Sequence, residues 1–111
     1  MEKLLQDNSI GFALLDENLH LLHFSELFVL FATPGRRPQP GQLVTDCYLE
    51  VFGLEEELSK LSKTPAASLM LSCIHRTLLE SGTHYLDFKF VALPPHTHEQ
   101  PKLLFTVSDE T

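Results

Sequence analysis

Two short apolar runs joined by a tight polar turn impose the strongest constraint on the fold of this 111-residue chain. Residues 11–15 and 19–24 are mainly apolar, and Asp-Glu-Asn at positions 16–18 separates them. Runs of this length, interrupted by Asp and Asn, are typical of a β-hairpin. Such a hairpin begins an antiparallel sheet to which later strands must be added.

Two more strand patterns close the chain, at residues 85–93 and 102–107. In the first of them Leu86, Phe88 and Phe90 alternate with polar residues, as a sheet with one buried face requires. Strands first, helices between and strands last predict an α+β fold, a single antiparallel β-sheet of four to five strands with helices packed on one face. A chain of this length forms one domain, with a cap helix over residues 1–9 and a core over residues 10–111.

Helical patterns fill the middle of the chain. Ser25 is placed to cap a short helix that ends near residue 32, and short helical turns are expected over residues 43–52. An amphipathic helix is indicated by Leu54, Leu58 and Leu61, at the spacing of one helix face. The longest predicted helix covers residues 65–80, with Thr64 as its cap. Its apolar stripe consists of Ala66, Met70, Cys73, Ile74 and Leu78.

The composition excludes several classes of function. An apolar fraction of 43% with 21% charged residues is ordinary for a folded globular domain. The formal net charge of −7 argues against nucleic acid, because phosphate binding needs a concentrated basic face. No apolar run approaches 18 residues, so membrane insertion is not expected. Cys47 and Cys73 lack metal-ligand spacing and predict two buried, reduced thiols in a cytoplasmic protein.

The inward face of the predicted sheet, with the helices above it, supplies candidate pocket residues. Bulky side chains at native packing density more often fill a core than line a cavity, so a filled or small cavity is favoured. A small apolar ligand is the alternative. The pocket candidates are Phe12, Leu14, Phe28, Met70, Ile74, Phe88, Phe90 and Phe105.

The opposite face of the sheet is the predicted contact of a homodimer. Exposed apolar side chains on one sheet face, continued by the N-terminal helix, suit a second copy of the same chain. The candidates for this dimer face are Leu4, Leu5, Leu15, Leu22, Phe24 and Leu104.

Several short sequence motifs, and their order along the chain, resemble those of a PAS domain, a cytoplasmic sensor fold common in bacterial signalling proteins. Residues 10–18 look like the opening strand and turn of that family, and Phe28 lies where its first helix buries an aromatic residue. The stretch 40–53 resembles the glycine and short central helices of the family. The other similarities are the end of the long helix at residues 79–82, the Leu-Pro step at 93–94 and the closing residues 107–111, which are similar to an Asp-Ile-Thr signature.

The chain departs from the family pattern at two places. Ser25 replaces the asparagine that usually begins the first helix of the family. Residues 82–107 hold two clear strands where the family usually has three, so the missing strand is expected as a short piece around His84.

The resemblance implies a sensory and dimerisation module of a cytoplasmic signal-transduction protein, such as a sensor histidine kinase or a nucleotide cyclase, and not an enzyme in itself. A change in the pocket or at the dimer contact would shift the last strand, and residues 108–111 would pass that shift to a C-terminal effector domain. A ligand-free protein–protein interaction adaptor and a haem-binding sensor are the alternatives.

The absence of any cofactor is the favoured prediction. Photoreactive flavin-binding relatives resemble one another in an Asn-Cys-Arg-Phe phrase, and Cys47 is not followed by the arginine. Haem would require an axial histidine on the predicted long helix. His75 is the one candidate there, but helical geometry turns it away from the apolar stripe.

Metal binding and covalent catalysis are also weakly supported. His96 and His98 form a His-x-His pair that could chelate a metal, although solvated histidines are favoured in a proline-bounded turn. Ser25, Ser81 and Ser108 have no neighbouring base in the sequence pattern, and no Gly-rich phosphate loop occurs. No catalytic residue is therefore predicted.

Overall fold

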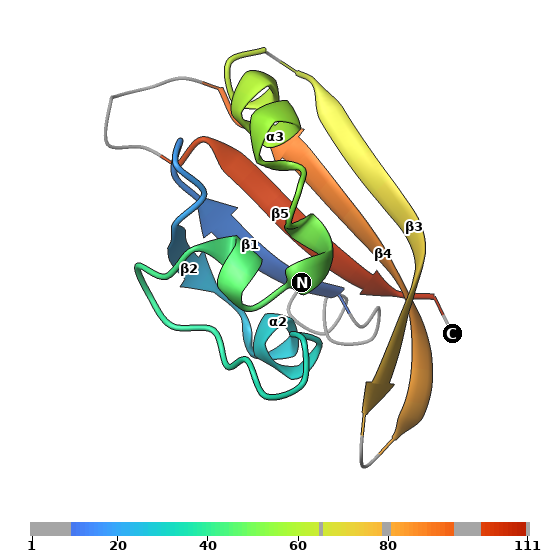
Figure 1. Cartoon of the computed structure of the whole chain (residues 1–111). Coiled ribbons are helices and arrows are strands. Elements are labelled where there is room, and N and C mark those ends of the chain that lie inside the picture. Colours follow the sequence, from blue (N-terminus) through green and yellow to red (C-terminus); the bar gives the residue numbers. More distant parts are fainter. Residues whose placement is uncertain (1–9, 65, 79–80, 95–100, 111) are drawn as a thin grey trace, which may run out of the picture.

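The computed structural model describes residues 10–64, 66–78, 81–94 and 101–110, and within them one antiparallel sheet of five strands. The strands are β1 (Ile10–Leu15), β2 (Leu21–Phe24), β3 (Ser68–Leu78), β4 (Gly82–Ala92) and β5 (Leu103–Asp109). Their order across the sheet is β2-β1-β5-β4-β3 (Figure 1). The predicted α+β class and single antiparallel sheet are confirmed.

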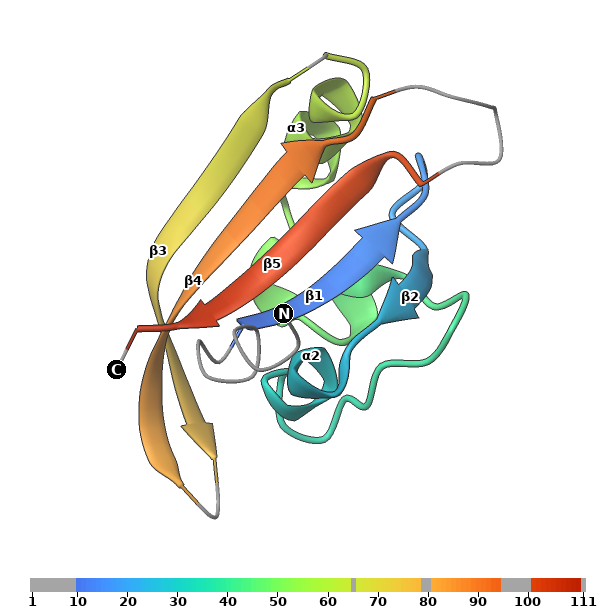
Figure 2. The ribbon, with the colours of Figure 1, turned by 180° about the vertical axis from the view of Figure 1, so that it is seen from behind.

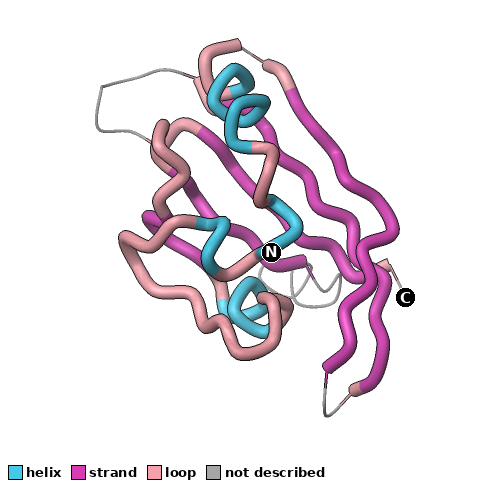
Figure 3. Tube along the Cα trace, in the orientation of Figure 1, coloured by secondary structure: helices cyan, strands magenta, loops and turns pink. Residues whose placement is uncertain are grey.

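The described helical elements all lie between β2 and β3 in the chain and cover one face of the sheet (Figures 1 and 2). They are helices α2 (Glu26–Leu30) and α3 (Glu55–Leu61) and the 3₁₀ turns η1 (Val44–Asp46) and η2 (Leu49–Val51). Figure 3 shows the long proline-rich loop that connects α2 to the first of these turns. The predicted cap helix over residues 1–9 lies outside the described residues.

The first and last strands along the chain, β1 and β5, are direct neighbours in the sheet. β1 pairs antiparallel with β5 along its whole length, from Ile10 opposite Ser108 to Leu15 opposite Leu103. The two strands predicted at the end of the chain are confirmed as β4 and β5. Leu86, Phe88 and Phe90 of β4 are fully buried, in agreement with the predicted alternation.

The side of β1 that faces the core is the opposite of the predicted one. Ala13 and Leu15 are fully buried, whereas Phe12 is 38% exposed and Leu14 only partly buried. The reason is the close approach of helix α2: a Cβ placed on Gly11 would lie 2.6 Å from the backbone nitrogen of Phe28. Small residues therefore face the helix, and the larger side chains of β1 point to the other side of the sheet.

The predicted helix over residues 65–80 is wrong, because Ser68–Leu78 within this segment form strand β3 and pair antiparallel with β4. This strand is the third one that was missing from the predicted sheet, and it lies before β4 rather than around His84. The alternation of β3 is interrupted by a bulge between Leu71 and Ile74, which shifts the inward side by one residue. With that shift Leu71, Ile74 and Leu78 all pack against the core, and their spacing in the sequence resembles that of one face of a helix.

Candidate functional site

Phe105, on the central strand β5, is the centre of an aromatic cluster between the sheet and the helices. Its ring centroid lies 5.3 Å from that of Phe28 in α2, 5.2 Å from that of Tyr48 and 4.2 Å from that of Phe90 in β4. Phe88 completes the cluster at 5.4 Å from Phe105. All five rings are fully buried, so the last strand contacts both the helical layer and its neighbour strand through one side chain.

The eight predicted pocket residues do not all meet in this interior. Phe28, Phe88, Phe90 and Phe105 do so, as predicted. Ile74 is partly buried and packs against the edge of the core. The other three are turned away from it, since Phe12, Leu14 and Met70 point to the face of the sheet opposite the helices, where Met70 is 54% exposed.

A buried polar cluster that no sequence pattern predicts lies beside the aromatic rings. Arg76 of β3 is only 4% exposed. Its guanidinium binds both carboxylate oxygens of Glu50, at 2.6 and 3.1 Å, and its Nε donates to the carbonyl of Phe31 at 2.8 Å. The same guanidinium lies 5.6 Å from the centre of the Tyr48 ring, within cation–π range. The signal for this cluster is an arginine that faces inward from a strand, and the helix predicted for this segment hides it.

Burial also perturbs two neighbouring groups after η1. The Tyr48 hydroxyl donates to the Phe28 carbonyl at 2.6 Å, and burial raises the pKa of this phenol well above its ordinary value. Burial, assisted by the negative charge of Asp46, raises the pKa of the Cys47 thiol to about 12. Both groups therefore stay protonated at neutral pH and add no charge to the core.

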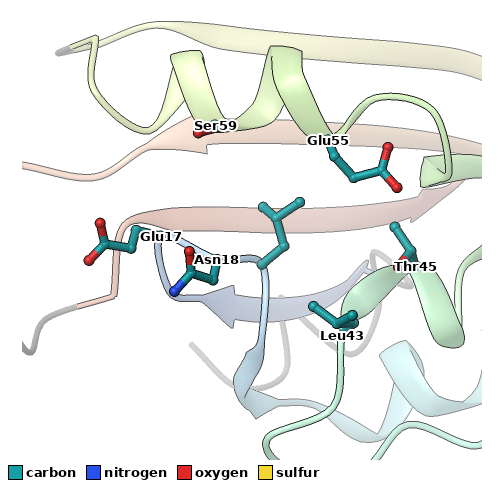
Figure 4. A pocket seen from close by; sticks show the side chains of 7 residues that line it. Glu17, Asn18, Leu43, Thr45, Glu55 and Ser59 are labelled. Carbon is teal, nitrogen blue, oxygen red and sulfur yellow. The ribbon is translucent and has the colours of Figure 1, made fainter.

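A surface cleft of about 240 Å³ lies between the β1–β2 turn, the segment before η1 and helix α3 (Figure 4). Leu19 connects this cleft to the core, because its side chain belongs to the core cluster and is only 5% exposed. It lies in the left-handed region with a φ of 68°. The lining residues are Glu17, Asn18, Leu19, Leu43, Thr45, Glu55 and Ser59.

The sheet face opposite the helices carries a band of apolar side chains from several strands. Leu14, Leu104 and Val91 stand side by side on β1, β5 and β4, and Phe12 lies one row away. Of the predicted dimer face, Leu104 is present here and Leu22 is partly buried on the edge strand β2.

Two members of the predicted dimer face belong to the core instead. Leu15 is fully buried, and Phe24 packs against the core with its ring 5.9 Å from that of Phe28. The cause is the same inversion of the first strand, since Leu15 and Phe24 lie on the side that faces helix α2. Leu4 and Leu5 lie outside the described residues.

The remaining candidates for cofactors and metals gain little from the structure. His75 lies on strand β3, exposed, with its ring 4.8 Å from that of Tyr85, so it does not point into the interior where a haem ligand would be needed. Cys73, predicted to be buried, is exposed in the β3 bulge, whereas Cys47 is buried. His96 and His98 lie outside the described residues. Within the described part of the chain, no group of three or more His, Cys, Asp or Glu side chains could hold a metal ion.

Ser81 has a positioned base, contrary to the prediction. Its hydroxyl lies 2.8 Å from Nε2 of His84, and Nδ1 of the same ring lies 2.8 Å from a carboxylate oxygen of Asp109. Asp109 is 25 residues from His84 in the chain, so the sequence spacing could not show this contact. Ser25 occupies the N-cap position of α2, as predicted, but its hydroxyl makes no capping bond to the helix and accepts a hydrogen bond from the backbone N–H of Phe12 at 3.0 Å.

The sequence matches no protein-family model, and none of the curated proteins matches it significantly. Within the described residues, no helix is both long and apolar enough to cross a membrane.

Proposed function

We propose that this chain is a PAS-like sensory and dimerisation module of a cytoplasmic signal-transduction protein, such as a sensor histidine kinase or a nucleotide cyclase. The observation that carries the proposal is the position of Phe105 in the last strand, with its ring against rings from α2, the segment after η1 and β4. The third strand expected of the family is present as β3, although it takes the place of the long helix that the resemblance implied.

The proposed relay is mechanical. A ligand in the cleft would press on Leu19 and displace α3 or the segment before η1, and the close-packed rings would pass that displacement to Phe105. Packed cores switch between discrete arrangements rather than deform smoothly, so a small shift at the cleft would move β5 as a unit. The C-terminal end of β5 then carries the change to an effector domain.

The described interior favours a second candidate function, a ligand-free interaction adaptor. Five fully buried aromatic rings in mutual contact occupy the space between the sheet and the helices, where a small apolar ligand was the alternative. In this second function the same module only joins two chains.

For the dimer contact we propose the sheet face opposite the helices, with a second copy of this chain as its occupant. Its apolar band of Phe12, Leu14, Leu104 and Val91 crosses three adjacent strands. Asp87 and Lys89 lie on the same face of β4, so this surface carries charges of both signs, which a two-fold contact would bring into register between two copies.

Thermal unfolding of the purified protein across a panel of small polar and apolar metabolites separates the two functions. A compound that binds only the native state stabilises it by about 2.7 kcal/mol when its free concentration is a hundred times the dissociation constant. This gain in stability appears as a higher melting temperature. The Ser59→Trp variant, which fills the cleft, should lose the shift, and Lys60→Trp on the exposed side of the same helix should keep it. A panel without any shift supports the adaptor and contradicts the sensor.

A further inference from the structure

Ser81, His84 and Asp109 form a continuous hydrogen-bonded chain near the turn of the β3–β4 hairpin. The Ser81 Oγ to His84 Nε2 distance is 2.8 Å, and the His84 Nδ1 to Asp109 Oδ2 distance is 2.8 Å. Three elements meet here: Ser81 precedes β4, His84 lies within β4 and Asp109 ends β5, where it is paired with Leu86.

The carboxylate of Asp109 determines the tautomer of His84. An ionised carboxylate can only accept hydrogen bonds, so Nδ1 must carry the proton. In the neutral imidazole this leaves the lone pair on Nε2, which then accepts the hydroxyl proton of Ser81. The imidazole is therefore oriented as a base toward the serine oxygen.

Packing holds the base in place while the nucleophile stays accessible. The side chains of His84 and Asp109 are each 16% exposed, and the His84 ring lies against the Phe31 ring at a centroid distance of 5.6 Å. Ser81 is exposed. Arg76, the cross-strand partner of His84, is held by Glu50, so its charge is already paired.

We propose that Ser81 is a nucleophilic serine, activated by His84 with Asp109 as the positioning residue, that is acylated by small activated esters. A hydroxyl next to a base that is oriented by a third group is the arrangement that makes serine nucleophilic. The described contacts supply a base and a carboxylate, so the substrate must bring its own good leaving group. Peptides and unactivated amides are therefore outside the proposed substrate class.

The proposed step balances without any added reagent. The Ser81 Oγ forms a bond to the carbonyl carbon of the ester while the hydroxyl proton moves to Nε2 of His84. The bond from that carbon to the leaving-group oxygen breaks, and the leaving alkoxide or phenolate departs with the electron pair. The proton then passes from Nε2 to the leaving group or to solvent.

The test uses p-nitrophenyl acetate with the full chain, followed by release of p-nitrophenolate and by mass spectrometry of tryptic peptides. Cleavage after Arg76 and Lys89 isolates Ser81 on a peptide without cysteine, so acylation of Cys73 is counted separately. We expect one acetyl group on Ser81 and its loss in Ser81→Ala. His84→Gln should slow acylation by about 10²- to 10⁴-fold, the usual share of a general base.

Ser108→Ala is the matched control, because the Ser108 hydroxyl contacts the Glu110 carboxylate and no imidazole. It should acylate at the wild-type rate, while Asp109→Asn should be slower, since the amide no longer enforces the required tautomer. Acetyl groups on lysines or Cys73 with Ser81 unmodified in the wild type would overturn the proposal, even if His84→Gln fails to fold. An undiminished Ser81 rate in a folded His84→Gln variant would overturn it as well.

Discussion

At the scale of single residues, the ion pair between the buried Arg76 and the partly exposed Glu50 is the contact on which stability should depend most visibly. Taking the guanidinium out of water is costly, and its bidentate contact with Glu50 and its hydrogen bond to the Phe31 carbonyl offset that cost. If the carboxylate is removed, the guanidinium of Arg76 is left with unsatisfied groups in a buried position. The pair therefore serves to specify the position of β3 against the helical layer.

We expect Glu50→Gln to lower the free energy of unfolding by about 2–3 kcal/mol, because it weakens charge-assisted hydrogen bonds to a buried guanidinium. Urea denaturation measures this change. Glu56→Gln on the exposed surface of α3 is the control and should stay within about 0.5 kcal/mol of the parent. Equal effects of the two substitutions would show that the Arg76 pair is not a stabilising contact.

Because the thiol of Cys47 is buried, we expect the folded protein to lose stability at alkaline pH. Its pKa is raised from 9.0 to about 12 in the folded protein, so the folded state retains a proton that the unfolded chain releases. Stability contributed in this way is complete below pH 9 and falls as pH rises toward 12, by at most about 1.4 kcal/mol per pH unit. Tyr48, whose pKa is also raised, adds a second loss above pH 10.

Urea unfolding of the wild type and Cys47→Ala at pH 8, 9 and 10 tests this prediction. The decline between pH 9 and 10 should flatten in Cys47→Ala and persist in Cys73→Ser, because Cys73 is exposed. A wild-type curve without any decline above pH 9 would contradict the assigned burial of Cys47.

At the scale of secondary-structure elements, the contact between β1 and α2 depends on the absence of a side chain at Gly11. A Cβ there would approach backbone atoms of Leu27 and Phe28 to 2.9 and 2.6 Å, and backbone cannot move aside as a flexible side chain can. We expect Gly11→Ala to reduce the free energy of unfolding by about 1–3 kcal/mol in chemical denaturation. Ser68→Ala, at an exposed position of the edge strand β3, is the control and should change it by no more than about 0.5 kcal/mol.

At Cys73, in the bulge of β3, we expect the effect of glycine on stability to have the opposite sign. This residue has a φ of 61°, in the left-handed region that costs non-glycine residues about 1–2 kcal/mol. Cys73→Gly should therefore be at least as stable as the parent and about 1–2 kcal/mol more stable than Cys73→Val. At Ser68 in the same strand, valine should instead be favoured over glycine. The same preference at both positions, read from thermal melts, would contradict the bulge.

At the scale of the whole molecule, the proposed signalling function involves the open face of the sheet and the position of β5. The strand that leads to the C-terminus lies between β1 and β4, so it contacts the aromatic cluster on one side and the proposed dimer face on the other. A structural change at either surface would therefore displace the same strand, β5.

The proposed dimer can be tested by measuring its dissociation constant. Leu104→Lys places a charge within the apolar band of the outer face, and we expect sedimentation equilibrium to show a dissociation constant at least tenfold weaker than that of the wild type. Leu30→Lys, on an exposed residue of α2 on the other side of the sheet, should leave the dimer unchanged. A wild-type protein that stays monomeric at high concentration would contradict the dimer.

Local patterns predicted the parts of this fold whose partners are close in sequence or whose exposure simply alternates. The β1–β2 turn, strands β4 and β5, helix α3 and the proline-rich loop follow from residues within a few positions of one another. The candidate site was predicted only in part, because Phe28, Phe88, Phe90 and Phe105 meet in the interior but Phe12, Leu14 and Met70 do not. Arg76 was missed altogether, since its role exists only once β3 is a strand.

The sequence by itself therefore determined the α+β class, the single antiparallel sheet and the aromatic character of the core, because burial of alternating apolar residues is a local property of the chain. Tertiary structure alone decided which side of β1 is buried, that residues 68–78 form a strand, and that Ser81, His84 and Asp109 meet. The physical reason is that these outcomes depend on a partner surface far away in the sequence: the backbone of α2 for Gly11, the β4 ladder for β3 and the end of β5 for His84.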